Sequence, residues 1–109
     1  METFDLADLS TAARDSGEEY LEFIRRDSLS AGIYRLAAGQ EDTQTPHSED
    51  ELYYVASGRA RMRVGSEIAP VGAGTVIFVA AHQEHQFVDI TEDLDILVFF
   101  APAEGSTAS

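Results

Sequence analysis

Among the histidines and acidic residues of this sequence, whose side chains can bind transition metals, three stand out, and two of them lie close together along the chain. His47 precedes Glu51 by four residues, directly ahead of the apolar segment 52–55, and His85 lies in a second polar segment. Imidazole and carboxylate groups together form many zinc and non-haem iron sites. A histidine close to acids is more often part of a surface ion pair, so spacing alone leaves both interpretations open. There is no cysteine, which excludes thiolate ligands and disulfides.

The segments that must position these residues read as short strands separated by turns, a pattern typical of an all-β barrel or sandwich. The expected strands are 20–25, 29–37, 51–56, 60–64, 75–79, 86–90 and 94–100. Turn residues separate them, among them Ser57-Gly58 and the segment 91–93. Only residues 8–14 have a helical pattern, and they are too few to form a stable helix alone. At 109 residues the chain suits one domain.

One expected strand shows its two faces clearly. Arginines alternate with apolar residues in the order Arg59, Ala60, Arg61, Met62, Arg63 and Val64. In a strand this alternation puts the three arginines on one face and the apolar side chains on the other. The arginine face could be a solvated surface paired with acids on a neighbouring strand. It could also line a pocket or an oligomer interface.

The charge balance limits the possible partners. The chain carries 20 acidic residues against seven arginines and no lysine, for a formal net charge of −13. Such a charge repels phosphate backbones and anionic lipids, which argues against nucleic-acid and membrane partners. The N-terminus resembles no signal peptide, and the longest apolar run, 96–101, is too short to span a membrane. We therefore expect a soluble, acidic protein located in the cytoplasm.

The intervals between glycines and candidate ligands resemble the two sequence motifs of the cupin superfamily. The first motif is matched by Gly39, Thr45, His47, Glu51 and Gly58. The second is matched by Gly74, Ala80, His82, His85 and Asp89. The resemblance covers roughly residues 29–102 and is to small single-domain cupins of the cupin 2 conserved-barrel type.

The resemblance implies an all-β cupin barrel, also called a double-stranded β-helix or jelly roll, over residues 29–102. Residues 1–28 would form a short N-terminal extension packing on the barrel, and residues 103–109 a flexible tail. In cupins, the side chains at the positions of His47, Glu51 and His85 point into the barrel and bind one divalent metal ion. Two imidazoles and one carboxylate suit iron, manganese, nickel or zinc, and they leave coordination positions open.

The sequence departs from the family pattern at Thr45, where cupins usually have a first histidine. A threonine hydroxyl is a weak ligand, so we expect Thr45 to face the metal site and water to fill this position. Tyr53 has the strand parity of Glu51, and Phe87 has that of His85. We therefore expect Thr45, Tyr53 and Phe87 to line a substrate pocket.

The other polar residues of the two motifs have lesser expected roles. Glu49 and Asp50 are interpreted as exposed acids. Glu49 is the reserve candidate for the metal position that Thr45 leaves vacant. His82 has no ligand role in the family and is expected to face solvent.

The fold alone does not determine a function, because cupins include dioxygenases, isomerases, epimerases, lyases and non-catalytic binders. An open-coordination metal favours a metalloenzyme that acts on an oxygen-rich small molecule by dioxygenase, isomerase or lyase chemistry. The alternative is a non-catalytic cupin that binds or senses a small ligand, with a structural metal or none. A third possibility is a structural dimer without a ligand. The sequence does not decide whether the protein is an enzyme.

A homodimer is the expected assembly. Small single-domain cupins commonly pair their sheets, and the arginine face at residues 59–63 needs acidic neighbours. These acids could come from the same chain or from a second copy.

Overall fold

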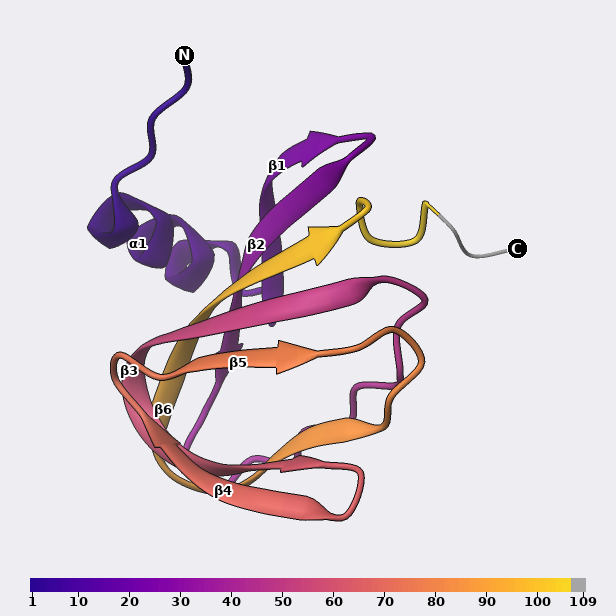
Figure 1. Cartoon of the computed structure of the whole chain (residues 1–109). Helices are drawn as coiled ribbons and strands as arrows, with labels where there is room; N and C mark the ends of the chain where they lie inside the picture. The colour runs from indigo at the N-terminus through magenta and orange to yellow at the C-terminus, as the bar shows by residue number, and fades with distance from the viewer. Residues whose placement is uncertain (107–109) are drawn as a thin grey trace.

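The computed structural model describes residues 1–106 as one helix and six antiparallel strands that curve around a common core (Figure 1). The elements are α1 (Leu6–Ser16), β1 (Tyr20–Arg26), β2 (Leu29–Leu36), β3 (Asp50–Val64), β4 (Glu67–Gly72), β5 (Val76–Val79) and β6 (His85–Ala101). Hydrogen bonds link the strands in the order β1-β2-β6-β3-β4, and β5 pairs with residues 51–54 of β3. The all-β prediction is confirmed. Within the described residues, no helix is long and apolar enough to cross a membrane.

Two long strands, β3 and β6, form the centre of the sheet and pair with each other along most of their length. The turns predicted at Ser57-Gly58 and at residues 91–93 are wrong, because each long strand continues through them. The pairing becomes irregular there instead, with register shifts between residues 55 and 61 of β3. Gly58 permits this bend, because its φ is 100° and an added Cβ would lie 2.2 Å from the Asp93 carbonyl oxygen.

The strand β4 is absent from the sequence prediction. Its sequence includes Pro70, which cannot donate a hydrogen bond to a neighbouring strand. The structure places β4 at the edge of the sheet, beside β3 alone. An edge strand needs donors on one side only, so it accommodates a proline there.

The inward side chains of β3 and β6 build the core. On β3 the residues Glu51, Tyr53 and Val55 are buried and alternate with exposed ones. On β6 the buried positions include His85 and Phe87. The strand parity predicted for both aromatic residues is therefore confirmed. Two of the three candidate ligands occupy core-facing strand positions that are otherwise apolar.

The N-terminal part of the chain forms a helix and the first strand. Helix α1 begins after Asp5, whose side chain accepts a hydrogen bond from the Asp8 backbone N–H at 3.2 Å. The helix packs against β1 and β2 (Figure 1). The segment 1–28, predicted as an extension, therefore contains β1 as well, and the sheet begins at Tyr20.

The segment after β6 folds back onto the hairpin of β1 and β2. The Ala103 N–H donates to the carbonyl of Asp27 at 3.3 Å, and the Glu104 N–H donates to the Ser30 hydroxyl at 2.9 Å. The first residues of the predicted flexible tail, 103–106, are thus held against the sheet. Residues 107–109 lie outside the described part of the chain.

The arginine face of β3 points outward and is paired within the chain. The pairs are Arg59 with Glu92 (3.6 Å), Arg61 with Asp89 (3.3 Å), and Arg63 with Gln86. All three partners lie on β6, the neighbouring strand. The structure therefore favours the solvated surface over the interface interpretation of this stripe.

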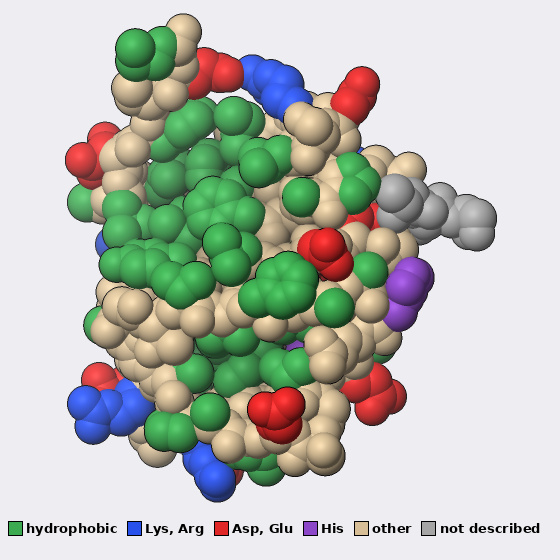
Figure 2. Space-filling model, viewed as in Figure 1, with side chains coloured by type: hydrophobic (Ala, Val, Ile, Leu, Met, Phe, Trp, Pro, Cys, Tyr) green, Lys and Arg blue, Asp and Glu red, His purple; other side chains and the backbone are tan. Residues whose placement is uncertain are grey.

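A different surface carries exposed apolar side chains, which Figure 2 shows gathered on one face of the molecule. Six residues lie in register on the outer face of three adjacent strands: Leu52 and Tyr54 on β3, Val76 and Phe78 on β5, and Leu97 and Phe99 on β6. Phe78 and Val76 are the most exposed, at 61% and 59%. Contiguous apolar patches of this kind are typical of interaction sites.

The homodimer stays a prediction, but we now expect its contact at this apolar face. Two chains of net charge −13 repel each other least where neither presents a charge, and none of these six side chains is charged. Phe78→Glu should therefore convert a dimer into a monomer, whereas Arg61→Ser, on the arginine face, should leave it intact. Light scattering coupled to size exclusion measures both masses. A monomeric wild-type protein at tens of micromolar would contradict the prediction.

Candidate metal centre

The side chains of His47, Glu51 and His85 come together from three separate positions in the chain. His47 lies in the loop before β3, Glu51 is the second residue of β3, and His85 is the first residue of β6. One ligand atom from each residue lies within 4.8 Å of the other two. The His82 backbone N–H donates to the His47 carbonyl at 2.6 Å, which joins the two loops. The structure thus brings together all three predicted ligands.

The Glu51 carboxylate lies at the centre of this group. Its Oε1 is 2.8 Å from His47 Nδ1 and 3.1 Å from His85 Nε2. The Glu51 side chain is only 2% exposed, so water cannot stabilise its charge. A buried carboxylate requires positive or hydrogen-bonding partners, and the two imidazoles provide them for Oε1.

The second carboxylate oxygen, Glu51 Oε2, is buried and has no hydrogen-bond partner among the described residues. The Tyr53 hydroxyl donates to Gln44 Oε1 at 3.0 Å and is also close enough to the Glu51 carboxylate to influence its pKa. Leaving a buried charged oxygen without a donor costs about 1–3 kcal/mol or more. A cation bound between the carboxylate and the imidazoles would remove that cost. The residues present therefore fit a divalent metal ion.

The ring of His85 has its orientation fixed by the backbone. Its Nδ1 lies 2.8 Å from the carbonyl oxygen of Gln83, which can only accept a hydrogen bond. Nδ1 therefore carries a proton, and Nε2 faces Glu51. Metal-binding histidines typically donate their second ring nitrogen to a carbonyl or carboxylate in this way.

Hydrogen bonds within the group shift the pKa of each member. Hydrogen bonds to Glu104 and Glu51 raise the pKa of His47 to about 10. Burial opposes ionisation of Glu51, but hydrogen bonds from His47, His85 and Tyr53 and the charge of His47 together lower the pKa of Glu51 to about 2. Burial disfavours the charged form of His85, but its hydrogen bonds to Glu51 and to the Gln83 backbone, with the charge of Glu51, together raise the pKa of His85. Without metal, the group therefore favours a charged carboxylate between protonated imidazoles.

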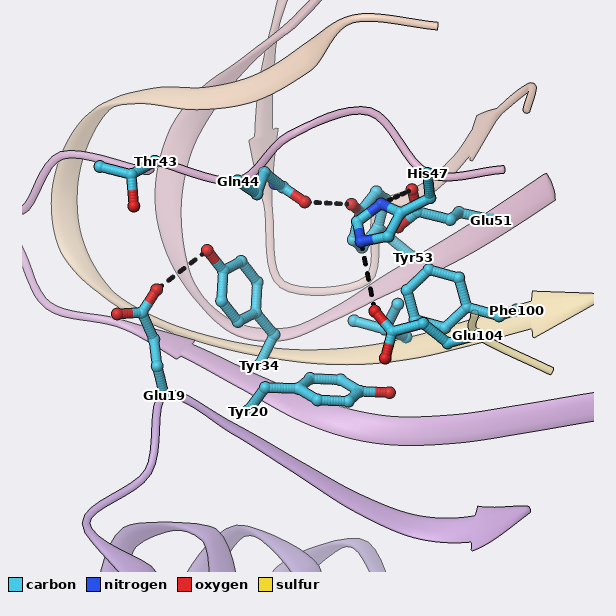
Figure 3. A pocket seen from close by; sticks show the side chains of 11 residues that line it. Glu19, Tyr20, Tyr34, Thr43, Gln44, His47, Glu51, Tyr53, Phe100 and Glu104 are labelled. Atoms are coloured by element: carbon cyan, nitrogen blue, oxygen red, sulfur yellow. Dashed lines mark hydrogen bonds and ion pairs between the residues drawn. The ribbon is translucent and has the colours of Figure 1, made fainter. Parts of the chain in front are cut away.

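A cavity of about 240 Å³ opens beside His47 and Glu51 (Figure 3). Its lining residues are Glu19, Tyr20, Tyr34, Thr43, Gln44, His47, Glu51, Tyr53, Val98, Phe100 and Glu104. They come from the segment between α1 and β1, the β1–β2 hairpin, the loop before β3, the two long strands and the C-terminal segment. Pockets for drug-sized ligands measure roughly 300–1,000 Å³, so this cavity suits a smaller molecule.

Of the three predicted pocket residues, only Tyr53 lines this cavity. Phe87 is 1% exposed and packs against Tyr53, with ring centroids 5.3 Å apart. Thr45 is exposed and borders a separate surface groove. The expectation for Thr45 assumed strand alternation with His47, but residues 40–47 form no strand. Thr45 therefore does not face the site as predicted.

The neighbouring residue Gln44 points toward the ligands instead. Its Oε1 lies 3.1 Å from His85 Nε2. The same oxygen accepts a hydrogen bond from the Tyr53 hydroxyl, as Figure 3 shows. Strand parity could not identify Gln44, because the conformation of an irregular loop decides which of its side chains faces inward.

The C-terminal segment supplies another residue that the sequence did not indicate. Glu104 Oε2 lies 3.2 Å from His47 Nε2, at the edge of the cavity (Figure 3). The segment is held in place in part by Glu49, whose Oε1 accepts from the Gly105 N–H at 3.1 Å. No short-range sequence pattern connects residue 104 with residue 47.

The remaining polar residues of the motifs can now be placed. Glu49 is 2% exposed, so its interpretation as an exposed acid is wrong; its carboxylate is turned inward and accepts a hydrogen bond from the Gly105 N–H. It lies outside the ligand group and is not positioned as the reserve ligand. Asp50 and His82 are exposed, as predicted.

Comparisons with known proteins identify the family. The family model described as Cupin domain matches residues 32–100. The chain is 43% identical to the Uncharacterized protein SCO3923 of Streptomyces coelicolor over 104 residues, which cover 95% of this chain and 99% of that protein. The chain therefore belongs to the cupin family, and its fold is the predicted double-stranded β-helix.

Solved structures agree with this assignment. TT1209 from Thermus thermophilus superposes with a TM-score of 0.74 at 27% identity, over 94% of this chain and 99% of that one. The DMSP lyase DddQ from Ruegeria pomeroyi superposes with a TM-score of 0.70 at 19% identity, over 87% of this chain and 51% of that one. At 19% identity, the similarity to the DMSP lyase shows a shared fold only.

The pKa shifts predict how the stability of the metal-free protein depends on pH. The pKa of His47 rises from 6.5 to about 10 on folding, so its stabilising contribution is complete below pH 6.5 and is lost toward pH 10. The pKa of Glu51 falls from 4.5 to about 2, so its contribution is complete above pH 4.5 and is lost toward pH 2. With a chelator present, Tm should therefore be highest between those two limits, pH 4.5 and 6.5.

A matched variant isolates the part due to His47. In His47→Gln the decline of Tm above pH 6.5 should become smaller. The variant removes the imidazole of His47, whose raised pKa causes that part of the decline. An alkaline decline of the same size in both proteins would show that another group causes it.

Proposed function

We propose that the protein binds one divalent metal ion through His47, Glu51 and His85. The protein would then be an enzyme that uses this ion to act on a small, oxygen-bearing molecule in the adjoining cavity. The observation that carries the proposal is the buried Glu51 carboxylate, which has imidazoles around Oε1 and no donor for Oε2 among the residues that the structure describes. Most buried polar atoms have a partner, so an unpartnered charged oxygen calls for an explanation, and a bound cation provides one.

The donor set suits the first-row metals that perform chemistry on oxygen compounds. Two nitrogens and one carboxylate are found in iron(II) and catalytic zinc sites, and manganese and nickel also accept them. A divalent ion with open coordination positions polarises a carbonyl or hydroxyl oxygen as a Lewis acid. The role of the three side chains is to hold it at the base of the cavity.

The cavity offers a free hydrogen-bond donor for such a molecule. The Tyr20 hydroxyl lines the cavity, is buried, and has no partner among residues 1–106. Burial raises the pKa of Tyr20 above its usual value, which keeps the hydroxyl protonated. It can therefore donate to a ligand oxygen, while Val98 and Phe100 form an apolar wall.

The charges around the cavity limit the ligand further. Glu19 and Glu104 both line it, and no lysine or arginine of the described chain does. Carboxylates at this position disfavour an anionic ligand and favour a neutral or cationic one. The expected ligand is thus a small neutral or cationic compound with a carbonyl or hydroxyl oxygen.

Glu104 has the position needed to move a proton on the bound molecule. Its side chain is 34% exposed and reaches the cavity beside His47. Isomerase and lyase reactions require a group that accepts or returns a proton at the substrate. The DMSP lyase of the same fold is named for a lyase activity, so this fold can accommodate such chemistry.

Metal binding is tested with one ligand variant and one matched control. His85→Ala removes one of the three ligands, so it should weaken zinc binding at least tenfold. His82→Ala removes an exposed histidine from the same loop and should leave the affinity unchanged. Elemental analysis of protein purified without a histidine tag, followed by chelator competition, measures both. Equal zinc occupancy in wild type and His85→Ala would rule out this ligand set.

A further inference from the structure

A second oxygen atom lies at the same distance from His85 as the Glu51 carboxylate does. Gln44 Oε1 and Glu51 Oε1 are each 3.1 Å from His85 Nε2. Ligands bound at about 2.0–2.2 Å to one ion lie roughly 3.0–3.5 Å from one another. The Gln44 oxygen is therefore spaced from its neighbour as a member of the same coordination sphere would be.

The orientation of the Gln44 amide is determined by its other end. Its Nε2 donates to Asp42 Oδ2 at 2.6 Å, and a carboxylate oxygen only accepts. The amide nitrogen therefore points toward Asp42, and the carbonyl oxygen toward Tyr53 and His85. The Gln44 backbone N–H also donates to Asp42, at 3.2 Å.

Asp42 itself is rigidly held, which fixes Gln44 in turn. Asp42 is 1% exposed. Beyond Gln44, its carboxylate accepts from the Tyr34 hydroxyl at 2.7 Å and from the Phe87 backbone N–H at 2.9 Å. The loop before β3 is thus anchored to β2 and β6 at this residue. Gln44 reaches the cavity from an anchored position although it lies outside any strand.

Two oxygen atoms face His85 Nε2, and their lone pairs require a proton or a metal ion between them and the ring. The Nδ1 proton of His85 is already donated to the Gln83 carbonyl. The carbonyl oxygen of Gln44 and the carboxylate of Glu51 then both face Nε2 with lone pairs. In the metal-free protein a proton on Nε2 can satisfy them, and a metal ion can take its place.

We propose that Gln44 is a fourth protein ligand of the metal, binding through its side-chain oxygen. The inference rests on the proposed function, since it requires the ion held by His47, Glu51 and His85. It assigns to Gln44 the coordination position that the sequence pattern assigns to Thr45. The site then has two nitrogen and two oxygen donors and fewer positions open to water.

The experiment uses Mn²⁺, whose bound water molecules can be counted by the relaxation of water protons. In Gln44→Ala the amide oxygen is replaced by water, so the number of water ligands on bound Mn²⁺ should rise by one. The affinity for Mn²⁺ should also fall, by about tenfold. Thr45→Ala is the matched control, because it shortens the next side chain, which is exposed, and both values should stay as in wild type.

A third variant separates ligation from positioning. Tyr53→Phe removes the hydroxyl that donates to Gln44 Oε1 but leaves that oxygen in place. If Gln44 is a ligand, Tyr53→Phe should not add a water to bound Mn²⁺. An unchanged water count in Gln44→Ala, even with weaker binding, would overturn the inference and leave Gln44 a positioning residue. Absence of Mn²⁺ and Zn²⁺ binding by the wild-type protein would instead overturn the proposed metal site, and this inference with it.

Discussion

The burial of the Glu51 carboxylate is the interaction on which the site and its surroundings depend. Moving one carboxylate out of water costs several kilocalories per mole, and only well-placed partners offset that cost. These partners, His47 and His85, lie in a loop and at the start of a strand that are distant in sequence. The folded protein must therefore bring both segments to the same point of β3. The folded protein thereby holds the proposed metal-binding side chains in place before a metal binds, with one oxygen of the Glu51 carboxylate still available.

Two more buried acids organise the segments around this centre. Asp42 anchors the loop before β3 and orients Gln44, and Glu49 helps to hold the C-terminal segment that carries Glu104. Each acid is almost fully buried; Asp42 accepts hydrogen bonds from two backbone N–H groups and Glu49 from one. An irregular loop and a terminal segment thereby acquire fixed positions beside the rigid sheet. The excess of acids in the composition is thus structural in part.

The sequence predicted those features that depend on local periodicity or on motif spacing. Alternation along β3 and β6 places Tyr53 and Phe87 inward, and the motif intervals identify the three residues of the candidate centre. The irregular pairing inside β3 could not be told from a turn, because Gly58 is as typical of a turn as of a bulged strand. The strand β4 could not be predicted, because Pro70 disfavours a strand except at the edge of a sheet. Whether a strand lies at an edge depends on the tertiary structure.

The residues that the sequence could not predict reach the site through irregular backbone. Thr45 and Gln44 are neighbours, and only the loop conformation decides which of them faces the ligands. Glu104 reaches His47 because the chain turns back after β6, and that turn depends on contacts with β1, β2 and a buried acid. Tertiary hydrogen bonds of this kind leave no periodic trace in the sequence.

Anomalous diffraction from crystals grown with excess Co²⁺ tests the central claim most directly. The account predicts one peak per chain within bonding distance of His47, Glu51 and His85. It would be contradicted by a structure with saturating Co²⁺ in which no peak lies at this group and Glu51 still pairs with both imidazoles.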